Sequence, residues 1–223
     1  MKRSIIVVSV LVMVSFVMLG IAQLTNLDGQ YSSLFENNKK SLYLTTPSKP
    51  LSDFAFEKAG EVTFTNQSLI GKWTLLFAGY TFCPDVCPST LADLDRIYPS
   101  LTNDQETTTQ VVFVSVDPNR DKAEQLADYV HYFNNNFVAV TSTHKTLWPF
   151  VTELGLIYSI VEAGDTDDFY LVDHSASIVL VNPKGEFHAT FKSIRDEQGI
   201  NRVDMDLMAD DLKKIQQQYV IEL

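Results

Sequence analysis

The stretch WTLLFAGYTFCPDVCP, residues 73–88, says more than any other about how this chain folds. Trp73 to Tyr80 are almost wholly apolar, which predicts a central strand buried on both faces. A cysteine pair follows directly, and Pro84 and Pro88 are residues that the first turn of a helix tolerates. A reactive cysteine pair placed between a long buried strand and a helix is typical of the thioredoxin arrangement.

Apolar periodicity and turn residues predict the elements on either side of this stretch. Strands are expected at residues 61–65, 73–80, 110–116, 137–140, 156–161, 177–181 and 186–191, and helices at 88–101, 121–135, around Trp148 and Pro149, and at 203–219. The segment Asn182-Pro-Lys-Gly185 suits a type I turn between the last two strands. This order predicts an α/β fold, a thioredoxin-like sandwich with an N-terminal β-hairpin extension.

The N-terminus predicts one transmembrane helix before that domain. Lys2 and Arg3 precede an apolar run from Ile5 to Ala22, whose 18 residues would rise about 27 Å as a helix. The two cations should stay in the cytoplasm, which places the domain on the extracytoplasmic, periplasmic side. A cleaved signal peptide ending near Gly20-Ile-Ala22 is the alternative. We therefore expect an anchor at residues 1–24, a polar tether at 25–50 and the domain at 51–223.

Composition limits the function classes. The chain has 223 residues, 45% of them hydrophobic, which is enough for one full core, and its formal net charge is −11. Such an acidic chain is a poor match for nucleic acid or for an anionic membrane surface. A basic protein partner is compatible with the charge.

The two cysteines, Cys83 and Cys87, are the whole cysteine content and lie too close in sequence to staple a domain together. Backbone N–H groups at a helix start favour the thiolate, which binds metals or attacks disulfides. At i and i+4 of a helical turn both sulfurs would face the same way. Two thiolates suit Cu(I), whereas a structural zinc would need more ligands. By spacing alone, a metal site, a redox pair and an inert pair all stay open.

Three motifs resemble the Sco/SenC family of copper proteins: GYTFCPDVCP at residues 79–88, VSVDPNRD at 114–121 and VDHSASIVLVNPKG at 172–185. The resemblance implies a thioredoxin-like domain that binds one copper ion, Cu(I) or Cu(II), through Cys83, Cys87 and His174. It implies a role in assembling the binuclear copper centre of cytochrome c oxidase subunit II, or of another oxidase copper subunit. The chain would receive copper from a donor protein and would deliver it, reduce the client's cysteines, or both.

Other polar residues carry weaker predictions. We interpret His131, His144 and His188 as structural, and Met205 and Met208 as core residues of the last helix. Asp117 and Arg120 are expected to cap a turn and to pair locally. Asp85 either complements the helix N-terminus or tunes the cysteine site.

Two rival functions remain at this point. A thiol–disulfide oxidoreductase would use Cys83 as nucleophile and Cys87 as resolving thiol, with no need for His174. A redox or copper sensor would signal through a partner. For one ion to reach all three candidate ligands, the stretch from about Ala163 to Ser175 must fold back over the start of the cysteine helix. We expect that stretch to be a polar loop.

Overall fold

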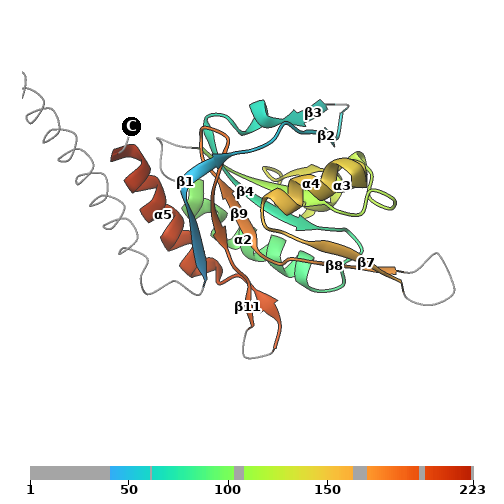
Figure 1. The fold of residues 1–223 in the computed structure, drawn as a ribbon. Coiled ribbons are helices and arrows are strands. Elements are labelled where there is room, and N and C mark those ends of the chain that lie inside the picture. Colours follow the sequence, from blue (N-terminus) through green and yellow to red (C-terminus); the bar gives the residue numbers. More distant parts are fainter. Residues whose placement is uncertain (1–40, 61, 103–107, 163–169, 196–198, 222–223) are drawn as a thin grey trace, which may run out of the picture. The chain divides into compact units, whose positions relative to one another are not determined.

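Two parallel apolar strands form the centre of the main sheet. The structure is a computed structural model that describes residues 41–60, 62–102, 108–162, 170–195 and 199–221. Its six-stranded sheet has the order β1-β10-β9-β4-β5-β6, with β4 (Lys72–Gly79) next to β5 (Thr108–Ser115) (Figure 1). Both strands are buried from their second residue onward, as their apolar sequences predict. Because they run parallel, their carboxyl ends reach the same edge of the sheet.

The predicted helices and strands are present in the predicted order, with ends shifted by a few residues, and the structure adds the unpredicted strands β1, β8, β11 and β12. The helices are α2 (Val86–Thr102), α3 (Ala123–Phe133), α4 (His144–Glu153) and α5 (Met205–Ile221), with a short 3-10 helix at Asn66–Leu69. The strands besides β4 and β5 are β1 (Leu42–Pro50), β2 (Ala55–Lys58), β3 (Val62–Thr65), β6 (Val138–Val140), β7 (Tyr158–Glu162), β8 (Tyr170–His174), β9 (Ile178–Val181), β10 (Glu186–Phe191), β11 (Ile194–Arg195) and β12 (Asn201–Arg202). The early hairpin is β2–β3, and Gly185 N–H donates to Asn182 O across the predicted turn.

The domain starts earlier than predicted. Residues 42–50 were expected to belong to the tether, but they form β1, which pairs antiparallel with β10 at the edge of the main sheet. An edge strand has a partner on one side only, and here only Leu42 and Thr45 are buried. Because few of its side chains are buried, this stretch was predicted to be a polar tether and not a strand. The predicted anchor lies outside the described residues, among which no helix is long and apolar enough to cross a membrane.

Helices α2, α3 and α5 cover one face of the sheet. Trp73 of β4 contacts Tyr219 of α5, with ring centroids 5.1 Å apart. Phe113 of β5 contacts Tyr129 of α3 at 5.8 Å. At the end of β4, Gly79 faces Cys87 of α2. Met205 and Met208 of α5 are buried, which confirms their predicted place in the core.

His188 is a largely buried side chain of β10. Its Nδ1 lies 2.7 Å from Ser48 Oγ, and its ring packs edge-on against Trp73 at 5.4 Å. Burial disfavours the imidazolium and lowers the pKa of His188 to about 4. The unfolded chain therefore takes up this proton at a higher pH than the folded chain does.

This difference predicts an acid-sensitive fold. Stability contributed by neutral His188 is complete above the unfolded pKa of about 6.5 and is lost as the pH falls towards 4, by about 3 kcal/mol. Urea unfolding at pH 7 and pH 4.5 measures this loss, and the loss should shrink in His188→Gln. His131, exposed on α3, provides the control: His131→Gln should keep the wild-type pH dependence. Equal pH dependence in wild type and His188→Gln would contradict the assignment.

Candidate metal centre

The cysteine turn lies where β4 ends and α2 begins. Cys83 sits in the turn before the helix and is partly exposed, whereas Cys87 is the second residue of α2 and is fully buried. The prediction that both cysteines lie on one helical turn is therefore wrong in detail. The N–H of Cys87 still donates to Cys83 Sγ at 3.3 Å, so the helix start is directed at this sulfur as expected. Both thiols are free.

His174 reaches the cysteines because of strand pairing. It is the last residue of β8, and β9 starts four residues later with Ile178 paired to Phe77 of β4. That register brings His174 to the carboxyl end of β4, where the cysteine turn begins. The stretch expected to be a loop is partly a strand, since residues 170–174 pair with β7, and residues 163–169 lie outside the described chain. The alternation of apolar and polar residues in Tyr170-Leu-Val-Asp-His174 is short and follows a polar stretch. It was therefore not recognised as a strand.

The three candidate ligand atoms converge. His174 Nε2 lies 3.2 Å from Cys87 Sγ, and the ligand atoms of Cys83, Cys87 and His174 all lie within 4.8 Å of one another. The predicted fold-back of His174 over the start of the cysteine helix is present. Of the His, Cys, Asp and Glu side chains that the structure describes, only these three form such a group.

The imidazole of His174 is held in one orientation. Its Nδ1 lies 3.2 Å from the carbonyl oxygen of Ser175, and a carbonyl can only accept a hydrogen bond. Nδ1 therefore carries the proton, and Nε2, which faces the sulfurs, has its lone pair free. The rings of Phe77 and Tyr80 pack edge-on against the imidazole, with centroids 6.1 and 5.9 Å away.

The two thiols differ strongly in acidity. A hydrogen bond from the Cys87 thiol is the largest cause that lowers the pKa of Cys83, to about 4, against an opposing effect of burial. Smaller hydrogen bonds come from the N–H groups of Cys87 and Asp85. Burial and the neighbouring Cys83 sulfur raise the pKa of Cys87 far above its ordinary value. At neutral pH the pair holds one thiolate, on Cys83, and one proton, on Cys87.

Sequence reasoning missed Gly79, the last residue of β4. A Cβ built on Gly79 would lie 2.8 Å from Cys87 Sγ and 2.6 Å from the ring of Phe113, closer than side-chain atoms pack. The hydrogen of Gly79 is what leaves space for the buried sulfur. The sequence of β4 gives no sign that Gly79 is needed for its small size, because the sulfur that it accommodates belongs to α2.

The other polar residues considered as candidates make local structural contacts. His144 Nδ1 lies 3.0 Å from Tyr158 Oη at the start of α4, and Arg120 pairs with Asp117 as expected. Asp85 is exposed directly before α2, and Ser89 Oγ donates to its carbonyl oxygen at 2.7 Å. That position matches a charge at a helix N-terminus, and the carboxylate reaches Ser89 Oγ at 3.3 Å.

The acidity difference predicts selective alkylation. Iodoacetamide should label Cys83 at pH 6 almost as fast as at pH 8, because its sulfur is already ionised, and should spare buried Cys87. The Cys87→Ala variant removes the thiol donor, so its Cys83 labelling should shift to higher pH. Mass spectrometry of labelled peptides measures both rates. A wild-type rate that climbs steadily up to about pH 8.5 would contradict a stabilised thiolate.

Comparison with known proteins assigns the family. The family model described as SCO1/SenC matches residues 44–207. A protein of Stutzerimonas stutzeri is 34% identical over 140 residues, 63% of this chain and 68% of that protein. The human mitochondrial protein SCO1 homolog is 34% identical over 126 residues, which span 55% of this chain but only 41% of the human protein.

Solved structures agree with the observed fold. The copper-bound crystal structure of Arabidopsis thaliana ScoI superposes with a TM-score of 0.64 at 29% identity, covering 74% of this chain and 98% of that one. Apo Sco1 from Thermus thermophilus also gives 0.64, at 30% identity, covering 77% and 94%. The predicted thioredoxin-like α/β class is thereby confirmed for the domain. This chain belongs to the SCO1/SenC family.

Proposed function

We propose that this chain is a copper-binding assembly factor that holds one copper ion through Cys83, Cys87 and His174. The observation that carries the proposal is the convergence of these three ligand atoms within 4.8 Å of one another. Two thiolates and a neutral imidazole form a soft donor set of the kind that copper prefers. Relatives with copper bound, the Arabidopsis ScoI structure and yeast Sco1, support the choice of ion.

The chain's own groups prepare the site for uptake. Cys83 offers a thiolate at neutral pH, and His174 offers the lone pair of Nε2. Cys87 has to release its proton when a metal binds, so uptake is coupled to proton release. Copper, when bound, would be the cargo that these ligands pass on.

The centre is open to a partner. Cys83, His174 and Tyr80 line a hollow of about 510 Å³, and Val161 and Leu171 also line it. Val161 and Leu171 are 46% and 42% exposed, which leaves apolar surface beside the ligands. Such a surface suits contact with a protein, and the family resemblance points to a copper subunit of cytochrome c oxidase as client and to a donor protein upstream. Whether the client receives copper, electrons for its cysteines, or both follows from its own chemistry.

A thiol–disulfide oxidoreductase is the second candidate, because the cysteines differ as a nucleophile and a resolving thiol do. Cys83 is partly exposed with a lowered pKa, and Cys87 is buried with a raised pKa. A low-pKa, accessible thiolate attacks disulfides. His174 separates the two functions, since only metal binding needs its nitrogen.

Losing a residue that only hydrogen-bonds to a metal ligand weakens metal binding by roughly 10- to 100-fold. Because His174 would itself be a ligand, we expect His174→Ala to weaken copper binding by more than that. Competition with a chelator measures the affinity. The His131→Ala variant, changed at an exposed histidine of α3, should bind like wild type. Reduction of a model disulfide by the metal-free protein should survive in His174→Ala. Unchanged copper affinity in that variant would refute the three-ligand site and favour the oxidoreductase.

We further propose that residues 1–24 anchor the domain to a membrane, with the domain on the extracytoplasmic side. The support is the 18-residue apolar run behind two cations. The full chain should fractionate with membranes and resist extraction by salt and alkali. A protease added to intact spheroplasts should digest the domain. A soluble protein whose first residue is Gln23 would show cleavage instead.

A further inference from the structure

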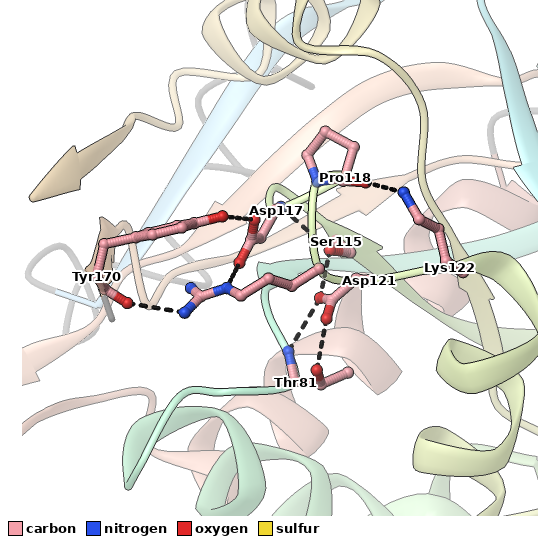
Figure 2. A network of polar contacts seen from close by, with 8 residues as sticks. Thr81, Ser115, Asp117, Pro118, Asp121, Lys122 and Tyr170 are labelled. Atoms are coloured by element: carbon pink, nitrogen blue, oxygen red, sulfur yellow. Dashed lines mark hydrogen bonds and ion pairs between the residues drawn. The ribbon is translucent and has the colours of Figure 1, made fainter. Parts of the chain in front are cut away.

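We propose that one short loop positions both halves of the metal centre, in addition to the ligands themselves. The loop clamp, as we name it, consists of Asp117, Arg120 and Asp121, between β5 and α3. Asp117 and Arg120 hold Tyr170 of the strand that ends in His174, and Asp121 holds Thr81, two residues before Cys83 (Figure 2). The functional consequence rests on the copper site proposed above.

The part of the loop clamp that positions His174, the histidine half, contacts Tyr170 at three points. Tyr170 Oη donates to Asp117 Oδ1 at 2.6 Å, and Arg120 donates from a guanidinium N–H to the carbonyl oxygen of Tyr170 at 2.9 Å. The guanidinium carbon of Arg120 also lies over the Tyr170 ring, 3.7 Å from its centroid, while Arg120 Nε donates to Asp117 Oδ2. Side chain, backbone and ring of one residue are therefore bound by a single ion pair, whose Asp117 is fully buried.

These contacts matter because of where β8 lies. β7 and β8 form their own two-stranded ribbon, separate from the six-stranded sheet, and Figure 1 shows the ribbon projecting beyond the end of the sheet. Tyr170 begins β8 and His174 ends it, about 13 Å apart along an extended strand. A ribbon attached only at the histidine end could swing about that end. Fixing Tyr170 at the other end sets the direction of the strand and so the position of the imidazole.

The cysteine half is a buried carboxylate. Asp121 is 1% exposed, and its Oδ2 accepts from Thr81 N–H at 3.0 Å and from Ser115 Oγ at 2.6 Å. Its Oδ1 accepts from the Thr81 hydroxyl at 2.5 Å. Hydrogen bonds to an ionised acceptor are stronger than neutral ones. Asp121 therefore ties the start of the cysteine turn to the end of β5.

The two halves share one rigid turn. The N–H groups of Arg120 and Asp121 both donate to Asp117 O, at 3.3 and 2.9 Å. The guanidinium further packs over Tyr80, 5.6 Å from its centroid, and Tyr80 is one of the rings that flank His174. A displacement of this turn would move the imidazole and the sulfurs relative to each other. The loop clamp thus keeps the ligand atoms together before any ion arrives, which lowers the ordering entropy lost on binding.

The histidine half is tested with Arg120→Met and Tyr170→Phe, and with Arg96→Met as a matched control. Arg96 is an exposed arginine of α2 that also forms an ion pair, with Asp206 at 2.8 Å. Hydrogen exchange of the metal-free protein is followed by mass spectrometry. Residues 170–174 should exchange about tenfold faster or more in Arg120→Met, since charge-assisted bonds are lost, less so in Tyr170→Phe, and as in wild type in Arg96→Met.

The Cu(II) form gives a readout that loss of stability alone would not move. The electron paramagnetic resonance spectrum of Arg120→Met should shift towards that of His174→Ala, because the imidazole leaves the metal, whereas Arg96→Met should keep the wild-type spectrum. If Arg120→Met does not fold, Tyr170→Phe carries both measurements. Wild-type exchange in residues 170–174 together with a wild-type spectrum in the folded variant would overturn the histidine half.

The cysteine half has its own variant, Thr81→Val, which removes the hydroxyl donor to Asp121 but keeps the shape of the side chain. Exchange of residues 80–87 should rise in the metal-free protein, and that of residues 170–174 should not. No change at residues 80–87 would overturn this half. A wild-type protein that takes up no copper would refute the proposed function, and the exchange measurements would still decide whether the loop clamp holds both segments.

Discussion

The antiparallel pairing of β9 with β4 is the contact on which the metal centre depends. Ile178 pairs with Phe77, and this register places the segment before β9 beyond the carboxyl end of β4. His174 and Cys87 are 87 residues apart in sequence, yet their ligand atoms lie 3.2 Å apart. A shift of one residue in that register would turn the side chains of β9 to the other face of the sheet. β9 also pairs with β10 on its other side, so such a shift would have to break two sets of strand pairs at once.

The two cysteines of the metal centre differ in charge at neutral pH. Cys83 is stabilised as a thiolate by hydrogen bonds from the Cys87 thiol and from N–H groups at the start of α2. Cys87 is buried beneath Gly79 and keeps its proton. One accessible thiolate and one protected thiol serve either metal binding or disulfide exchange. The imidazole, held by the carbonyl of Ser175, is the feature that favours the metal.

Much of the fold could be read from the sequence because burial has a clear local pattern. The apolar runs of β4, β5 and β9 and the periodic helices were predicted within a few residues of their observed ends. The strands that were missed include β1, β8 and the two-residue strands β11 and β12, and the first two were missed for a common reason. β1 lies at an edge of the main sheet and β8 in a two-stranded ribbon, so each buries few side chains and lacks the long apolar run of a central strand. The prediction of both cysteines on one helical turn failed because α2 begins only at Val86.

The sequence by itself determined the chemistry of the candidate ligands, since two cysteines separated by three residues and a histidine within a motif can be recognised without a structure. It also determined the long buried strand that carries the cysteines. Only the tertiary structure decided that these three side chains meet, that Gly79 must lack a side chain, and that Arg120 reaches Tyr170 as well as Asp117. The physical reason is distance along the chain. Local spacing determines which residues share a turn or a strand face, whereas contacts between residues 40 to 90 positions apart depend on strand register and helix packing, which involve the whole core.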